Sequence, residues 1–206
     1  LFRMSDVVDA NISKEFQEKI FSQLKKNITK YNLVILSDFN YGVLSSELII
    51  NIIKLCKDNN IKVFADTQVS SQIGDVEKFN GVDLLSSTER ELRYSYKDKD
   101  SGIIELSSKI IKKLKLTNLI VKLGSDGIII RTSDNDTDKI GALNLFPINA
   151  SGAGDSLLVL TSLATISNAT IWESALLGSI AASIQVSREG NIPINFNEFN
   201  KQLSIL

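Results

Sequence analysis

LVILSDFNYGVLSSELIINIIKLCKDNNIKVFAD, residues 33–66, is the stretch that decides the fold. It begins with a short apolar run, Leu33–Leu36, which predicts a buried strand. Apolar residues then recur at helical spacing from Leu48 to Cys56, and a second short apolar run follows at Ile61–Ala65. A helix between two buried strands is typical of a parallel sheet that is covered by helices.

The same alternation continues to the end of the chain. Further strands are expected at Val82–Leu85, Leu119–Leu123 and Gly127–Arg131, and helices at Ile12–Leu24, Glu89–Tyr94, Ser101–Leu116, Ala153–Ile166 and Ile171–Val186. The strand at 127–131 is expected to form a hairpin with the one before it, while 132–139 is expected to be a surface loop and 143–146 is a candidate short strand. We therefore predict one α/β domain over residues 1–206, a three-layer fold whose mainly parallel sheet has helices on both faces.

Polar or small residues follow the ends of four expected strands. They are Asp38, Asp66, Ser86 and Gly124. In open α/β sheets, ligands bind beyond the carboxyl ends of the strands. We therefore expect Asp38, Asp66, Gly124 and the later Gly152 to lie along one rim of the sheet.

Composition narrows the function. The 206 residues carry a formal net charge of −1, which shows no electrostatic footprint for nucleic acid or a membrane surface. The chain has no histidine, so a Ser-His-Asp triad within it is excluded. The single cysteine, Cys56, cannot form an intramolecular disulfide, and its apolar helical setting predicts a buried small hydrophobe. No apolar run is long enough for a transmembrane helix, and we expect a cytoplasmic setting.

The segment from Asn149 to Ser156, NASGAGDS, is the most informative for chemistry. Small residues open a long apolar helix here, and free amides at a helix start together with the helix dipole favour an anion. Asp155 would then stand in the first turn, where a carboxylate is well placed to accept a proton from an attacking hydroxyl. Tight packing of Gly152 and Gly154, with Asp155 favoured only by the dipole, is the alternative interpretation.

At this point the sequence resembles a known family. Residues 151–155, SGAGD, look like the D-[TS]-x-G-A-G-D signature of PfkB (ribokinase-like) carbohydrate kinases. Residues 36–44, LSDFNYGVL, and 64–67, FADT, are similar to the S-D-Y-x-K-G-x-L and A-D-P-K segments of the heptose-phosphate kinase branch. Residues 122–127, KLGSDG, resemble the [TK]-L-G-x-x-G nucleotide segment. These matches follow the family's order over nearly the whole chain, and they imply a ribokinase-like fold and a kinase that uses ATP and Mg²⁺.

The resemblance also implies roles for single residues. Asp155 would be the catalytic base, and the backbone of Gly152, Ala153 and Gly154 would form the anion hole for the transferring phosphoryl group. Glu91 would help to hold Mg²⁺ through water, although it could also be a helix-surface carboxylate.

The remaining roles divide between the nucleotide and the sugar. Lys122 is the only charge in an apolar strand, so it either extends to solvent or reaches the rim and contacts a phosphate. The nucleotide residues would be Lys122, Gly124, Gly127, Gly190 and Asn191, and the residues on the sugar side would be Asp38 and Asp66.

Four departures from the family pattern bear on activity and substrate. Asn149 stands where the signature usually has Asp, and Thr88 stands where the Mg²⁺ segment usually has Asn. Thr67-Gln68 replaces a Pro-Lys pair and Asn40-Tyr41 replaces an x-Lys pair, which removes positive charge that a phosphorylated sugar would favour. A small-molecule sugar kinase is the leading hypothesis, and a catalytically weak nucleotide- or sugar-binding protein on the same fold is the alternative. The retained Asp155 favours the kinase, because binding alone needs no base.

The first residues suggest that a preceding segment is absent. Leu1-Phe2-Arg3 reads as the end of a strand, and the resemblance begins about a third of the way into a typical family member. The absent part would hold a glycine-rich signature, much of the sugar pocket and a lid sheet. We expect exposed apolar surface where that part would pack, and the full-length protein is a candidate homodimer.

Overall fold

A six-stranded sheet organises the chain. The computed structural model describes residues 10–68 and 75–205. The strands follow one another in sequence order, and the first four are parallel while the last two pair antiparallel. They are β1 (Leu33–Asp38), β2 (Lys62–Thr67), β3 (Leu84–Thr88), β4 (Asn118–Lys122), β5 (Ile128–Thr132) and β6 (Thr137–Ile140).

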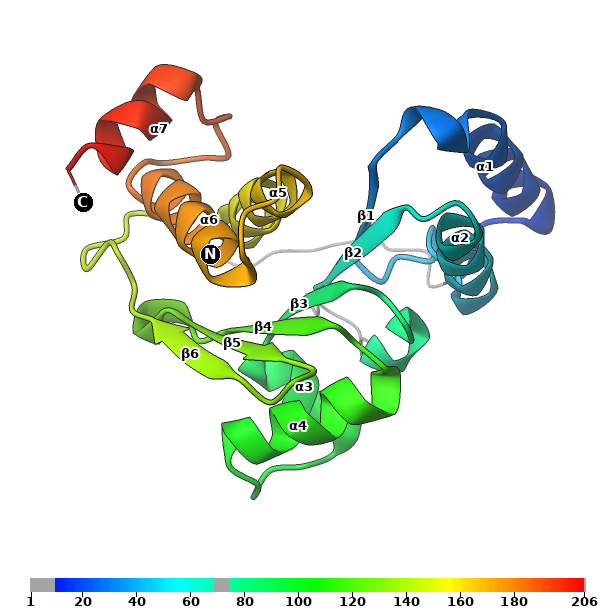
Figure 1. Ribbon diagram of the computed structural model, residues 1–206, viewed down its shortest axis with the longest axis horizontal. Helices are drawn as coiled ribbons and strands as arrows, with labels where there is room; N and C mark the ends of the chain where they lie inside the picture. Colours follow the sequence, from blue (N-terminus) through cyan, green and yellow to red (C-terminus); the bar gives the residue numbers. More distant parts are fainter. Residues whose placement is uncertain (1–9, 69–74, 206) are drawn as a thin grey trace.

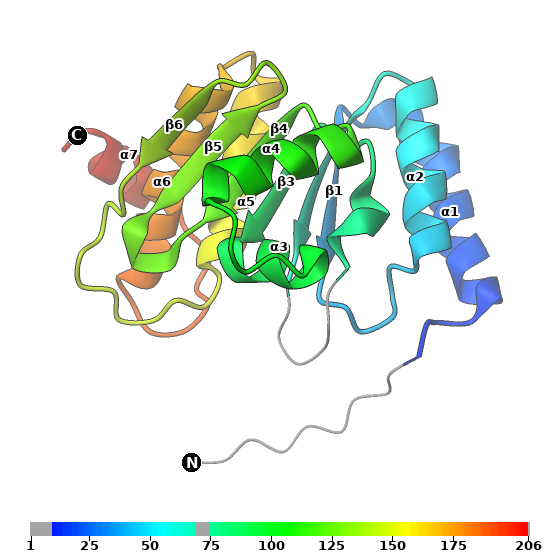
Figure 2. The same ribbon diagram turned by 90° about the horizontal axis from the view of Figure 1, so that it is seen from below.

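Helices cover both faces of this sheet, as Figures 1 and 2 show. One face carries α1 (Lys14–Asn27), α2 (Ser46–Asp58), α3 (Glu89–Tyr96) and α4 (Ile103–Leu114). The other carries α5 (Ala153–Ile166) and α6 (Ile171–Val186), with α7 (Phe196–Leu203) beside α6. The expected three-layer, mainly parallel α/β architecture is confirmed.

The alternation of side chains along each strand divides the core into two clusters. Val63 and Ala65 of β2 pack with α2 and α4, whereas Phe64 packs with α5 and α6. In β4, Val121 belongs to the first cluster and Ile120 to the second. Successive strand residues point to opposite faces, so the apolar runs in the sequence supply both cores at once.

The segment between β5 and α5 differs from its prediction in two places. Residues 137–139 of the expected loop, together with Ile140, form the edge strand β6. The polar side chains of this strand suit an exposed sheet edge. Residues 143–146 form no strand, so that prediction is wrong. The Asn144 side-chain oxygen accepts the backbone N–H of Phe146 at 2.9 Å, a local bond that competes with strand pairing.

Three further features concern helix α7, the single cysteine and the character of the helices. Helix α7 was not expected, although Asn195 and Glu198 form a capping box that its sequence spacing signals. Cys56 is fully buried as expected, and burial raises the pKa of its thiol to about 11, which disfavours the nucleophilic thiolate. Within residues 10–68 and 75–205, none of the helices has the length and apolar character needed to span a membrane. The opening residues Leu1–Arg3 lie outside the described part of the chain.

Candidate active site

The glycine-rich segment begins α5 with a sharp turn. Gly152 is the residue before the helix and has φ +77°, a left-handed conformation that L side chains rarely adopt. A Cβ atom there would also lie 2.3 Å from the side-chain oxygen of Asn191. The first amides of α5 have no partner within the helix, and the Ala153 N–H donates to the Ala150 carbonyl oxygen at 3.3 Å in the turn before it. These amides carry the positive end of the helix dipole, which suits an anion.

Asn149 supports this turn without being an aspartate. Its side-chain oxygen accepts the backbone N–H of Ser151 at 2.8 Å. An Asp oxygen would accept the same bond, because both side chains form such turns two residues ahead. The departure at Asn149 therefore leaves the geometry of the turn intact.

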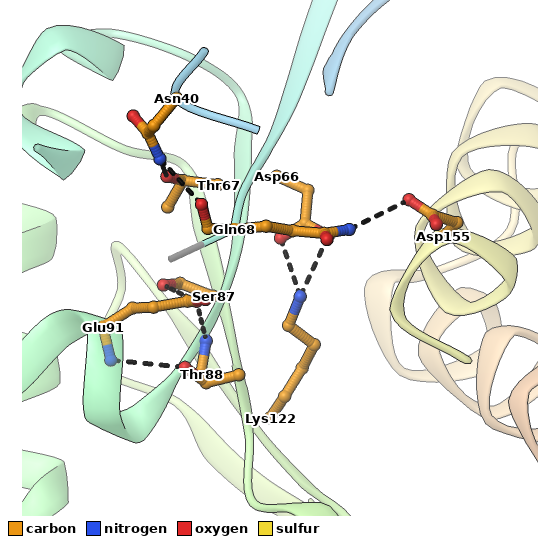
Figure 3. Close-up of polar contacts among 9 residues, drawn as sticks. All are labelled: Asn40, Asp66, Thr67, Gln68, Ser87, Thr88, Glu91, Lys122 and Asp155. Carbon is orange, nitrogen blue, oxygen red and sulfur yellow. Dashed lines mark hydrogen bonds and ion pairs between the residues drawn. The ribbon is translucent and has the colours of Figure 1, made fainter. Parts of the chain in front are cut away.

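Asp66 and Lys122 meet beneath this turn. Asp66 follows Phe64 by two residues and Lys122 follows Ile120 by two, so both charged side chains point to the face that α5 covers. The Lys122 ammonium lies 2.7 and 2.9 Å from the two Asp66 carboxylate oxygens (Figure 3). A Cβ atom on Gly154 would lie 3.1 Å from the Lys122 nitrogen, so a larger residue there would require the ammonium to shift by a few tenths of an ångström.

The environment of Asp66 perturbs its protonation. The residue has no solvent exposure, and burial raises its pKa to about 6. The Lys122 charge and hydrogen bonds act in the opposite direction, and the negative charges of Glu91 and Asp155 raise the pKa further. The carboxylate form is therefore kept at neutral pH in large part by Lys122.

This pKa predicts a pH dependence of stability. An Asp with a folded-state pKa above its unfolded value stabilises the fold below the unfolded pKa, and this contribution is lost as pH rises through about 6. From pH 7 to pH 5, wild type should gain about 1 kcal/mol relative to Asp66→Asn. Denaturant unfolding of both proteins at the two pH values measures this, and a constant difference between them would contradict the assignment.

Asp155 lies half-buried in the first turn of α5. Its carboxylate accepts a hydrogen bond from the side-chain amide of Gln68 at 3.4 Å, and Gln68 directly follows β2 (Figure 3). Asp155 is also close enough to Asp66 for their charges to interact. The predicted base thus lies at the same rim as the Asp66–Lys122 pair.

Asp38 ends β1 at this rim and is almost fully buried. It pairs with the ammonium of Lys78, a largely buried cation that no sequence motif singles out. Its other oxygen accepts the backbone N–H of Asn40 at 3.0 Å. The pairing of Lys78 with Asp38 could not be predicted from a sequence motif, because Lys78 belongs to the short helix Val76–Phe79, 40 residues further along the chain.

Glu91 takes part in a capping box at the start of α3. Its carboxylate accepts bonds from the Ser87 hydroxyl at 2.9 Å and the Thr88 backbone N–H at 2.7 Å, and the Thr88 hydroxyl accepts the N–H of Glu91. Thr88 therefore has a structural role at the position where the family pattern has Asn. Glu91 is only 7% exposed, so it is not a helix-surface carboxylate.

The acidic residues at the rim fit Mg²⁺ only as partial ligands. Among residues 10–68 and 75–205, no group of three or more His, Cys, Asp or Glu side chains could hold a metal ion. Mg²⁺ usually keeps several waters and takes one or two protein carboxylates together with substrate phosphates. The single carboxylate of Glu91 is chemically compatible with a Mg²⁺ ion that keeps most of its waters.

Two cavities meet at Lys122 and Gly124. One, of about 250 Å³, is also lined by Gly127, Ala153 and Gly154, so it joins the predicted nucleotide residues to the start of α5. The other, of about 1060 Å³, opens over α3 and is lined in part by Thr88. The Lys122 ammonium reaches the rim of the sheet, where it pairs with Asp66, so the prediction that it extends away to solvent is wrong.

Gln185 connects the turn before α5 to the loop after α6. It is 1% exposed, and its amide donates to the carbonyl oxygens of Ser151 at 3.2 Å and Gly190 at 3.1 Å. The structure therefore brings Gly190 and Asn191 next to the turn at Gly152. The sequence could have pointed to Gln185, because it is a polar residue within the apolar pattern of α6 and a buried amide needs hydrogen-bond partners.

Known proteins resemble this chain in sequence and in fold. A family model described as pfkB family carbohydrate kinase matches residues 4–196. The bifunctional protein HldE of Sulfurimonas denitrificans is 31% identical over 194 residues, which cover 92% of this chain and 39% of that protein. The bifunctional protein HldE of Aliarcobacter butzleri is 28% identical, with coverages of 95% and 40%. The chain thus spans about 40% of the length of the curated relatives that it matches.

Solved structures show the same fold at low sequence identity. Phosphofructokinase-2 from Escherichia coli, in complex with potassium, matches with a TM-score of 0.75 at 17% identity, covering 91% of this chain and 62% of that one. Ribokinase from Arabidopsis thaliana, complexed with ribose and ATP, matches with a TM-score of 0.73 at 20% identity, covering 96% and 61%. At these identities the likeness establishes the fold alone.

Proposed function

Because the chain belongs to the pfkB family of carbohydrate kinases, we propose that it catalyses ATP-dependent phosphorylation of a sugar or sugar-phosphate hydroxyl. The observation that carries this proposal is the convergence of three groups at one rim: the Asp155 carboxylate, the glycine-rich start of α5 and the Lys122 ammonium. A base, an anion site and a cation are the parts that phosphoryl transfer needs. We also propose that residues 1–206 all belong to a single kinase domain of this family.

The proposed reaction assigns a separate task to each group. Asp155 accepts the proton of the sugar hydroxyl while that oxygen attacks the γ-phosphorus of ATP. The bond between the γ-phosphorus and the bridging oxygen breaks, and ADP leaves with the electron pair. The amides of Gly152, Ala153 and Gly154 and the ammonium of Lys122 stabilise the charge on the transferring phosphoryl oxygens.

The nucleotide and its cation would occupy the joined cavities. Gly124, Gly127, Gly190 and Asn191 would border the nucleotide, and Glu91 would hold Mg²⁺ through water. When bound, Mg²⁺ neutralises charge on the β- and γ-phosphates.

Asp38 and Asp66 belong to the sugar side in this proposal. Both carboxylates are paired with a lysine, so we expect them to shape the site in part through Lys78 and Lys122. Lys78 also places an ammonium group, paired with Asp38, near the positions where Gln68 and Tyr41 replace the lysines of the heptose-phosphate branch. A phosphorylated sugar therefore remains in the proposed substrate class.

A catalytically weak binding protein is the second candidate. The sequence departures at Asn149 and Thr88 suggested it, but each residue makes the local bond that its turn or helix needs. The local geometry is kept at both positions, so neither departure supports an inactive protein.

Sugar-dependent release of ADP tests the proposal. The assay should compare a panel of free sugars with their phosphorylated forms, in the presence of Mg²⁺. We expect at least one sugar to accelerate ADP release strongly over the rate with water alone. Binding of nucleotide and sugar without any such acceleration would favour the binding protein.

A further inference from the structure

A chain of hydrogen bonds crosses the rim from β1 to α5. The Lys78 ammonium donates to the Asn40 side-chain oxygen at 2.9 Å, and the Asn40 amide donates to the Gln68 carbonyl oxygen at 2.8 Å. The Gln68 side-chain amide then donates to Asp155 at 3.4 Å. Figure 3 shows Gln68 extending from the end of β2 toward Asp155 on α5, with Asn40 on its other side.

Hydrogen bonds fix both main-chain polar groups of Gln68. The Gln68 backbone N–H donates to the carbonyl oxygen of Asp38 at the end of β1, at 2.9 Å, and the Gln68 carbonyl oxygen accepts the Asn40 amide from the loop that follows. Asn40 adopts φ +58°, a left-handed conformation that asparagine tolerates better than most residues and that its network of bonds holds in place. The backbone of Gln68 is therefore anchored, and its side chain is aimed across the rim from a fixed point.

The contact suits the orientation of a base. A carboxylate with one oxygen bound by a neutral amide keeps its charge, and its second oxygen stays available to a substrate hydroxyl. The amide adds no positive charge next to the base, unlike a lysine at the same position. Within the Asn40 amide, the Lys78 ammonium bound to the oxygen strengthens the bond that the nitrogen donates to the Gln68 carbonyl oxygen, because such bonds reinforce one another.

We infer that Gln68 is a positioning residue for Asp155, and that Asn40 and Lys78 hold Gln68 in the orientation that this requires. The inference rests on the proposed function, in which Asp155 is the base. The heptose-phosphate branch has a lysine at this position. In this chain Gln68 takes its place as a neutral donor that orients the Asp155 carboxylate toward the sugar hydroxyl.

The test compares three substitutions of Gln68 in the full-length protein. Gln68→Leu keeps the approximate size but removes the donor, and we expect kcat to fall about 10-fold while the KM for ATP changes less than about twofold. Gln68→Glu places a carboxylate against Asp155 and should lower kcat at least as much. Gln68→Lys restores a donor and should recover much of the kcat that Gln68→Leu loses. A purely packing role predicts the reverse order, with Leu the mildest change.

Two further variants make the result specific. Asn40→Gly keeps the left-handed backbone but removes the amide, and its effect on kcat should not add to that of Gln68→Leu if both act through one chain. Gln202→Leu, a half-buried glutamine on α7, is the matched control and should leave kcat unchanged. If Gln68→Leu is unfolded at the assay temperature, Asn40→Gly carries the test in its place.

A readout without catalysis separates the two proposals. The carboxyl ¹³C resonance of Asp155, followed by NMR, is expected to shift in Gln68→Leu and to stay in place in Gln202→Leu, whether or not transfer occurs. If wild type transfers no phosphate but the resonance still shifts in Gln68→Leu, the proposed kinase function is contradicted and the positioning role of Gln68 is not. Full kcat in Gln68→Leu with an unmoved resonance overturns the positioning role, even where Asp155→Asn is inactive.

Discussion

Asp155→Asn is expected to lower the rate of phosphoryl transfer by about 10²–10⁴-fold, while the affinity for ATP stays within a few-fold of wild type. Asparagine keeps the size of the side chain and can still hydrogen-bond a sugar hydroxyl, but it does not accept a proton usefully. The nucleotide phosphates are held in our proposal by the α5 amides, the helix dipole, Lys122 and Mg²⁺. None of these depends on the Asp155 charge, so chemistry and binding should separate.

The measurement is kcat together with ATP affinity by calorimetry for both proteins. Asp134→Asn is the matched control, because it removes the same charge from an exposed position in the turn between β5 and β6. A rate for Asp155→Asn within a few-fold of wild type would remove Asp155 from the mechanism. Equal losses of rate and affinity would show that the carboxylate acts in binding.

Lys122→Met should produce the largest loss of stability among the variants considered. It leaves the Asp66 carboxylate fully buried without its counter-charge, and breaking a buried pair from one side costs about 3–5 kcal/mol. Methionine preserves much of the volume of the lysine stem, so the effect reports charge more than packing. The variant should also bind ATP more weakly, since a cation at the start of α5 is lost.

The pH dependence and a double variant identify the cause. Asp66 in Lys122→Met can relieve its burial by taking up a proton, so the destabilisation should be smaller at pH 5 than at pH 7.5. Adding Asp66→Leu should recover part of the lost stability, because a buried pair can often be replaced by apolar residues. A loss of stability that is the same at both pH values would assign the effect to packing.

The sequence predicts the fold closely because the same residues supply pattern and packing. The apolar runs at β2, β3 and β4 became buried strands, and the ranges predicted for α5 and α6 agree with the structure. The run at β1 forms a strand at the sheet edge, and of its apolar residues only Leu36 is buried. The polar strand β6 could not be found this way, since it is stabilised by pairing with β5 at the sheet edge and has no apolar alternation.

The candidate site divides along a similar line. Residues at strand ends and in the glycine-rich segment were available from local sequence, and the structure brings Asp66, Lys122, Gly154 and Asp155 together. Lys78, Gln68 and Gln185 act through contacts that join distant parts of the chain. Such contacts depend on how the elements pack, which a single sequence does not display.

Transfer of a labelled γ-phosphate tests the central claim most directly. The protein should be incubated with Mg²⁺ and ATP labelled at the γ-position, in the presence of the sugar that best accelerates ADP release, and the products should be separated. We predict that the label appears on a sugar hydroxyl with wild type, in step with ADP formation, and falls at least about 10²-fold with Asp155→Asn. Label found only in inorganic phosphate, or transferred equally well by Asp155→Asn, would contradict the proposed kinase mechanism.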